Sequence, residues 1–343
     1  MRRIRMMNLS ILTDSDSDTW DNIVSSSPHS TLFHTWKFLK LMEKHSRAKL
    51  FGKSIKPTFL PVKIDDSSGT VGIIPLYYYK TPMKRTVISP PGGVQCLYLG
   101  PILCNVDTLI PRKRYSRFLS FQKELDTFMK EELQANSILI NSSPGLEDSR
   151  SYTWSDYTVE PRYTYRLDLR CGEEILWNNI GSRVRRNIKK SEKNGIEFME
   201  GKKDDIEELY NLLKDAERIF VPKEFLMEVF DAFYPENLRI LTVKYDENLL
   251  SGAIMTQYNN KFSFWIGFPK VSMKGMAPND LLYWKTIQWA LRQETDHLEM
   301  IGASEPMLFN FKNKFNSEIE LFFWMKWNSP AYRLMENVYK SIR

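Results

Sequence analysis

Residues 239–267 read RILTVKYDENLLSGAIMTQYNNKFSFWIG, and this stretch predicts three consecutive antiparallel strands. The strand-like runs are 239–245, 249–257 and 261–267, each rich in β-branched and aromatic residues. Polar turn residues separate the runs, and Asn259-Asn260 suits the positive φ angles of a tight hairpin. The stretch is therefore interpreted as a β-meander.

A helix and a further strand follow this meander, and the same order occurs earlier in the chain. Residues 278–294 predict a helix that has Pro278 in its first turn, and residues 297–301 predict a short strand. In the first half, the corresponding strands, helix and strand are predicted at 57–64, 70–80, 114–132 and 137–141. Chance recurrence of common supersecondary units is the alternative, but the shared order favours one fold built twice.

A pair of helices is predicted before each meander. The first pair lies within residues 20–44, and the second comprises residues 203–220 and 223–234. Ser, Pro, Gly and Asp cluster at 142–161, which marks a domain boundary. We therefore expect an α+β protein of mixed, largely antiparallel sheets flanked by helices, with domains at 1–150 and 151–343.

Length and composition indicate a compact globular protein of about two domains. The chain has 343 residues, of which 42% are hydrophobic and 26% charged, which argues against disorder and coiled coil. Its net charge of +6 supports an anionic ligand without indicating a nucleic-acid coat. No apolar run approaches the ~18–20 residues of a membrane helix. We expect a cytoplasmic location and no stable membrane insertion.

Several catalytic classes lack their motifs in this chain. There is no GxSxG, GxxxxGK[ST], GxGxxG after a strand, or HExxH. The three cysteines (Cys96, Cys104 and Cys171) form no CxxC pair, and the four histidines have no ligand-type spacing. We expect neither a disulfide framework nor a metal site.

The densest charge lies at residues 183–193, which hold six positive residues and one negative. On a helix, Arg186, Lys189, Lys190 and Lys193 form one stripe, while Val184 and Ile188 point the other way. Such a stripe can bind a phosphate or a polyanion, and a solvated helix face is the alternative. No aromatic residue is interleaved with it, which argues against a single-strand nucleic-acid platform.

Two further segments offer weaker signals. Residues 272–278 form a glycine-containing loop before a helix, and backbone N–H groups at such a helix start suit an anion. Residues 309–315 are aromatic and basic, and at least one of Lys312 and Lys314 is expected to point toward solvent or a cleft. An ordinary turn and ordinary packing are the respective alternatives.

Five segments together resemble the FemAB-type branch of the GNAT acyltransferase superfamily, including its BioF2-like acetyltransferase domains. Their order and spacing are more specific than any one of them, and the resemblance spans residues 20–327. The segments are Phe33-His34-Thr35-Trp36, Gly72-Ile73-Ile74-Pro75-Leu76, Ser182 to Ile196, Pro278-Asn279-Asp280-Leu281-Leu282 and Phe311-Lys312-Asn313-Lys314-Phe315.

The resemblance implies a tandem pair of GNAT folds, with a degenerate, acceptor-side first domain. It also implies an N-acyltransferase in which an amine attacks an acyl-CoA thioester or an aminoacyl-tRNA ester directly, with no covalent enzyme intermediate and no tightly bound cofactor. Lys312 resembles the lysine that stabilises the developing oxyanion. The implied acceptor residues are Trp36, Lys40 and Arg218, with Arg185, Arg186 and Lys189 on the basic helix. The implied donor residues are Lys274, Gly275, Ala277 and Asn279.

Two departures limit what the resemblance implies. Ser272 stands where the superfamily's acyl-CoA loop usually has Gln or Arg, and no long helical hairpin fits between Arg170 and Ser317. The acyl donor therefore stays open between acyl-CoA and aminoacyl-tRNA.

The acceptor is expected to be an amine on a small or a lipid-, nucleotide- or sugar-linked molecule that carries negative charge. The competing interpretation is a catalytically silent GNAT scaffold that binds a polyanion through residues 183–193.

Overall fold

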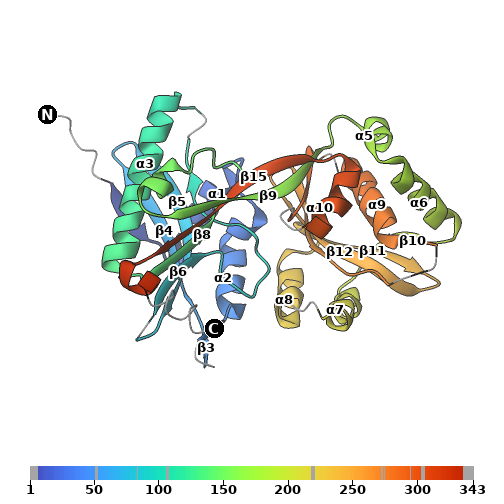
Figure 1. The fold of residues 1–343 in the computed structure, drawn as a ribbon, viewed down its shortest axis with the longest axis horizontal. Helices are drawn as coiled ribbons and strands as arrows, with labels where there is room; N and C mark the ends of the chain where they lie inside the picture. Colours follow the sequence, from blue (N-terminus) through green and yellow to red (C-terminus); the bar gives the residue numbers. More distant parts are fainter. Residues whose placement is uncertain are drawn as a thin grey trace. The chain divides into compact units, whose positions relative to one another are not determined.

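The computed structural model describes residues 7–50, 53–82, 84–105, 108–217, 221–271, 273, 275–293, 295–302 and 306–334. Contacts divide the chain into two units, residues 1–162 with 321–343, and residues 163–320 (Figure 1). This division differs from the expected domains 1–150 and 151–343 in two respects. The boundary falls at residue 162, and residues 321–343 return to the first unit because a long C-terminal strand pairs there.

The first unit is built on one mixed sheet. Its strand order is β1-β4-β5-β6-β8-β15, with β7 paired to β5. All neighbours are antiparallel except β6 and β8, which run parallel. The strands are β1 (Asn8–Ile11), β4 (Thr58–Asp66), β5 (Gly69–Lys80), β6 (Arg85–Ser89), β7 (Ile102–Leu103), β8 (Ser137–Asn141) and β15 (Glu318–Asn328), with a separate pair of β2 (Ala48–Leu50) and β3 (Lys53–Ile55).

Helices cover both faces of this sheet (Figure 1). The apolar side chains Phe118, Phe121 and Leu125 of α3 pack into the core on one face. On the other face, the Tyr77 hydroxyl donates a 2.9 Å hydrogen bond to the Leu39 carbonyl of α2. The helices are α1 (Ser17–Ser25), α2 (Trp36–His45), α3 (Pro111–Thr127) and α4 (Arg150–Trp154), with short turns at Asp14–Asp16, Leu32–His34 and Phe128–Glu132.

The second unit repeats this plan. Its sheet has the order β9-β14-β13-β12-β11-β10, and again a single pair, β13 and β14, is parallel. The strands are β9 (Thr158–Asp168), β10 (Glu197–Glu200), β11 (Leu238–Tyr245), β12 (Asn248–Tyr258), β13 (Lys261–Gly267) and β14 (His297–Met300). The predicted meander, helix and strand are confirmed in both halves.

The second unit's helices also lie on both faces of its sheet, with α7 and α8 on one side and α9 on the other (Figure 1). Gly252 of β12 permits α7 to approach, because a Cβ there would stand 2.7 Å from Leu209 Cδ2. The helices are α5 (Glu173–Asn179), α6 (Ser182–Lys193), α7 (Asp205–Asp215), α8 (Lys223–Phe233), α9 (Pro278–Arg292) and α10 (Pro306–Lys312), followed by a turn at Asn313–Phe315.

The two repeats exchange a strand. After β8 the chain continues into β9, whose residues 165–168 pair antiparallel with β14. After β14 the chain reaches β15, whose residues 324–328 pair antiparallel with β8. Each repeat therefore takes its last strand from the segment that follows the other repeat. In the described part of the chain, no helix is long and apolar enough to cross a membrane.

Candidate functional site

The parallel strands β13 and β14 separate before β13 ends. Their register runs from the Lys261–His297 pair to the Phe264–Met300 pair, and β13 then continues through Gly267 while it still pairs with β12. The backbone of 265–267 therefore has no strand partner on the β14 side among the described residues. A strand edge of this kind offers N–H and C=O groups to an extended ligand.

The first unit closes the equivalent opening with its own chain. There β6 and β8 pair only as far as Ser89 and Ile140. Leu99 then bridges to Ser142 and donates a 3.0 Å backbone hydrogen bond to Asn141. Gly100 packs so tightly here that a Cβ would stand 2.7 Å from Ser142 Cα. The edge that is open in the second unit is thus filled in the first.

Lys312 lies beside the end of β14. It is the last residue of α10 and is 4% exposed. Its ammonium donates to the carbonyls of Met300 at 3.4 Å, Ile301 at 2.5 Å and Gly302 at 2.6 Å. An ammonium has three donors, so all three hold this stretch of backbone.

Burial lowers the pKa of Lys312 to about 8, because the charged form loses hydration, and the Glu299 carboxylate opposes this shift. Glu299 is fully buried on β14. Its carboxylate accepts hydrogen bonds from Thr164 at 2.9 Å and Ser263 at 3.2 Å and lies 3.8 Å from the Lys261 ammonium. The site therefore combines one buried cation with one buried anion.

A second part of the site lies where α6 packs against the start of α9. The backbone N–H of Ala277 donates to the Ser191 hydroxyl at 3.2 Å, and the Asn187 side chain donates to Asp280 at 2.7 Å. Gly275 has φ +76°, and a Cβ on it would stand 2.8 Å from Lys190 Nζ. Lys190 thus places its charge against the loop that leads into the positive end of the α9 dipole.

Asn279 also lies at this helix start. Its Oδ1 is buried and has no hydrogen-bond partner among the described residues. The structure therefore brings together the predicted residues Gly275, Ala277 and Asn279 and adds Lys190, which belonged to the predicted basic stripe. Lys274 and Ser272 lie outside the described residues.

The remaining predicted cations of α6 have different surroundings. Arg185 donates to the carbonyls of Trp177 at 3.2 Å and Asn178 at 2.8 Å, so its guanidinium satisfies the end of α5. Lys189 lies 5.9 Å from the centre of the Trp177 ring. Arg186 is exposed. Arg185 therefore has a structural partner, whereas Arg186 faces solvent.

Two of the predicted acceptor residues, Trp36 and Lys40, lie in the first unit. Trp36 is buried, and its indole donates to Asp14 at 3.1 Å. Lys40 is half-exposed and forms ion pairs with Glu43 at 3.0 Å and Asp14 at 3.5 Å. Arg218 lies outside the described residues.

Sequence reasoning missed Glu299, Thr164 and Ser263. The available signal was a single acidic residue inside the apolar strand His297-Leu298-Glu299-Met300. A carboxylate there requires buried partners, since an unpaired charge is costly to bury. Those partners lie on β9 and β13, and no local sequence pattern predicts that these two strands lie beside β14.

Residues 180–313 match the family model for an acetyltransferase (GNAT) domain, which covers less than half of the chain. No curated protein sequence matches the chain.

Solved structures share its fold at low identity. A structure of FemX is 13% identical with a TM-score of 0.68, over 96% of this chain and 100% of that one. A tandem GNAT protein from the clavulanic acid biosynthesis pathway is 10% identical with a TM-score of 0.51, over 93% and 98%. The C-terminal domain of a putative lysylphosphatidylglycerol synthetase from Agrobacterium fabrum is 11% identical with a TM-score of 0.53, over 93% and 94%. The expected tandem GNAT fold with a FemAB-like arrangement is confirmed.

Proposed function

We propose that this chain, a FemAB-like acyltransferase of the GNAT superfamily, transfers an acyl group to an amine on a negatively charged acceptor, with the acyl donor bound in the second unit. One observation carries the proposal. The open edge of β13 leads directly into the loop where Gly275, Lys190 and the start of α9 meet. A donor that has an extended arm and a phosphate group fits here. The arm would pair with the strand edge, and the phosphate would lie at the loop.

The chemistry needs no covalent enzyme intermediate. The acceptor nitrogen forms a bond to the acyl carbon, the bond from that carbon to sulfur or ester oxygen breaks, the amine loses a proton and the leaving group gains one. The enzyme's contribution is then alignment of the two substrates and stabilisation of the developing oxyanion. Lys312 is the proposed source of positive charge, which acts through its electrostatic field and by fixing the backbone that it holds.

Acyl-CoA is the favoured donor because, among the described residues of the α6–α9 junction, Lys190 offers a compact anion site beside Gly275. Aminoacyl-tRNA is the second candidate, and the exposed cations Arg183, Arg186 and Lys193 of α6 favour it. A polyanion crossing this helix face would contact several of these charges together.

The acceptor is proposed to be lipid- or nucleotide-linked. A structural neighbour is described as a putative lysylphosphatidylglycerol synthetase, which supports a lipid-linked acceptor. We propose Trp36 and Lys40 of a degenerate first domain, together with Arg218, as its contacts. Lys40 would have to exchange its Glu43 and Asp14 partners for the acceptor's anion, so we expect its contribution to be salt-dependent.

Donor identity is tested by measuring binding of acetyl-CoA and of a charged tRNA by calorimetry at one salt concentration. Lys190→Ala is expected to weaken acetyl-CoA binding by about tenfold, the loss of one charge-assisted contact. Lys193→Ala, one turn further along the same helix, is the matched control and should leave it unchanged. If both variants lose acetyl-CoA affinity equally and the wild type binds charged tRNA tightly, aminoacyl-tRNA is favoured as the donor.

Catalysis is tested separately with Lys312→Met and its control Lys314→Met. Lys314 is exposed and its ammonium lies 5.0 Å from the Phe311 ring centre, so the control removes a charge from the same segment. We expect Lys312→Met to lower kcat by at least about 100-fold while donor affinity persists. Unchanged turnover in a folded variant would remove Lys312 from the mechanism.

A further inference from the structure

A group of large apolar side chains is exposed on α3 and α4 of the first unit. Trp154 is 68% exposed, Leu119 45% and Tyr115 42%. The Arg150 guanidinium lies 5.6 Å from the Tyr115 ring centre and 5.8 Å from the Trp154 ring centre, which joins the two helices. Leu119 follows Tyr115 by one helical turn and shares its face. We call these four residues, with the cations described next, the α3–α4 patch.

Cations of α3 flank the apolar side chains, while Arg150 itself is paired with Asp148 at 2.8 Å. Arg112, Lys113 and Lys123 of α3 are exposed, and none forms an ion pair with any residue that the structure describes. The first turn of α3 contains no acidic residue. Cations at the positive end of a helix dipole are unfavourable in isolation, so an anionic partner would stabilise this arrangement.

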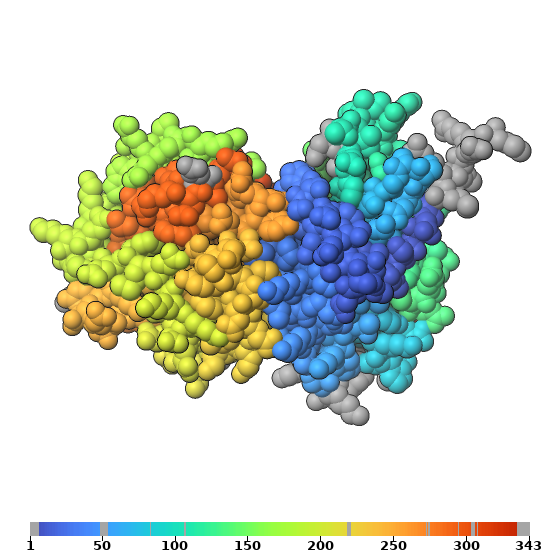
Figure 2. Space-filling model, turned by 180° about the vertical axis from the view of Figure 1, so that it is seen from behind, coloured from blue at the N-terminus to red at the C-terminus, as the bar shows by residue number. Residues whose placement is uncertain are grey.

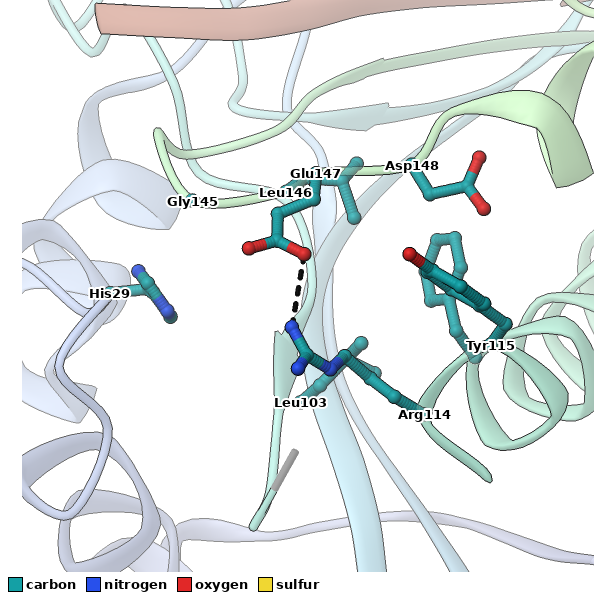
Figure 3. A pocket seen from close by; sticks show the side chains of 9 residues that line it. His29, Leu103, Arg114, Tyr115, Gly145, Leu146, Glu147 and Asp148 are labelled. Carbon is teal, nitrogen blue, oxygen red and sulfur yellow. Dashed lines mark hydrogen bonds and ion pairs between the residues drawn. The ribbon is translucent and has the colours of Figure 1, made fainter. Parts of the chain in front are cut away.

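A neighbouring hollow does not account for these charges. Figure 3 shows His29, Arg114, Tyr115 and Glu147 around it, with Arg114 and Glu147 joined across it by a 3.0 Å ion pair. Arg114 is thereby neutralised within the fold. Arg112 and Lys113, which come just before it, do not line the hollow. Figure 2 shows the teal atoms of α3 projecting from the first unit.

We propose that the α3–α4 patch rests on the surface of an anionic lipid bilayer. Tryptophan and tyrosine prefer the boundary between headgroups and acyl chains, and lysine and arginine above them contact anionic headgroups. Leu119 favours lipid over RNA, because an aliphatic side chain does not provide the flat face on which bases stack. This inference goes beyond the proposed function, since it concerns where the chain works and does not depend on acyl transfer.

The test is flotation of the full chain with vesicles of phosphatidylcholine alone and of phosphatidylcholine with 30% phosphatidylglycerol (about one lipid in three, enough to give a negative surface). We expect binding to the anionic vesicles only. Arg112→Gln with Lys123→Gln should lower the partition coefficient roughly 5-fold per cation removed. Trp154→Ser should lower it by at least about 5-fold, since a large apolar ring leaves the interface.

Tyr245→Ser is the matched control, because Tyr245 is 37% exposed but lies in the second unit. It should leave vesicle binding unchanged. All variants should retain wild-type circular dichroism and transfer to a soluble amine, which separates loss of docking from loss of catalysis. Equal binding to neutral and anionic vesicles, or no effect of the patch variants, would overturn the proposal.

Two other outcomes would replace it. Concentration-dependent dimerisation that Trp154→Ser abolishes would show that a second copy covers the patch. Binding of tRNA that Arg112→Gln with Lys123→Gln weakens, without vesicle binding, would show a nucleic-acid surface instead.

Discussion

Lys312 is an ammonium group held in surroundings that disfavour its charge. Its hydrogen-bond partners are three backbone carbonyls, which are neutral, and the nearest opposing charge is the Glu299 carboxylate. Burial without a direct carboxylate partner explains why its pKa is lowered to about 8. A lysine poised near neutral pH can lose or gain a proton during a reaction.

The lowered pKa of Lys312 makes a prediction about stability. Between pH 8 and 10.5 the unfolded chain binds this proton while the native chain has lost it, so the free energy of unfolding rises with pH across that window. The rise amounts to about 3 kcal/mol for a shift of this size. Urea unfolding of the wild type and Lys312→Met from pH 7 to 10.5 measures it. If the free energy of unfolding changes with pH in the same way in both proteins, the prediction is contradicted.

Glu299→Gln tests the buried anion. We expect it to lower the pKa of Lys312 further, because the Glu299 charge raises that pKa in the wild type. Because the proposed mechanism needs the protonated form of Lys312, the alkaline limb of the pH–rate profile should move to lower pH. The Glu299→Gln substitution should also lower the free energy of unfolding by about 3 kcal/mol, since Lys261 loses its buried partner.

The control for Glu299→Gln is Glu318→Gln. The Glu318 side chain is 79% exposed and lies 4.0 Å from Arg166, so its removal should change stability by less than about 0.5 kcal/mol. An unchanged pH profile in Glu299→Gln would show that the carboxylate serves packing alone.

At the scale of elements, the junction of α6 and α9 explains how a basic helix becomes part of a site. Val184 and Ile188 bury one face of α6 against the core, which turns its cations outward. Ser191 and Asn187 then fix the start of α9 through Ala277 and Asp280. The position of Lys190 over the loop follows from these two hydrogen bonds.

Gly275→Ala tests the loop between β13 and α9. Residue 275 has φ +76°, and the new methyl group would stand 2.8 Å from Lys190 Nζ. We expect donor affinity to fall by about tenfold as the loop and the lysine move apart. The free energy of unfolding should also fall by about 1–2 kcal/mol, because alanine is strained at this φ. Isothermal titration with acetyl-CoA measures this.

Gly92→Ala is the control for Gly275→Ala, because a Cβ on Gly92 meets nothing within 4 Å. It should bind the donor as the wild type does. If Gly275→Ala also binds normally, the loop does not contact the donor.

At the scale of the whole molecule, the exchange of β9 and β15 ties each repeat to a distant part of the chain. Met325 of β15 is fully buried in the first unit's core, although it comes from the C-terminal end of the chain. The first unit therefore cannot complete its sheet until residue 328 has been made.

Met325→Ala tests this exchange. We expect it to lower the free energy of unfolding by about 2–5 kcal/mol, the usual range for truncating a buried methionine. Hydrogen exchange should accelerate in β8 and α3 of the first unit, while α9 of the second stays protected. Leu321→Ala, at a 41% exposed position of the same strand, should have little effect. Accelerated exchange confined to the second unit would contradict the assignment of residues 321–343.

Periodicity alone located most of the regular elements. The meander at 239–267 and the helix at 278–294 correspond to β11, β12, β13 and α9, because their side-chain patterns are local properties of the chain. The helix predicted at 114–132 begins earlier, at Pro111, and ends as an α-helix at Thr127 before a single π-turn. The long strands β9 and β15 were not predicted, since their exposed halves carry no clean alternation.

Local side-chain patterns were enough to predict the repeated order of strands and helices and the basic face of α6, because both depend on residues a few positions apart. Which strand edge stays open depends instead on contacts between distant parts of the chain. Leu99 and Gly100 close the first opening through contacts with Asn141 and Ser142, and no local pattern encodes a pairing over some forty residues. The same reason applies to Glu299, whose partners lie on two other strands. Burial and pairing across the fold, rather than residue type, made that carboxylate part of the site.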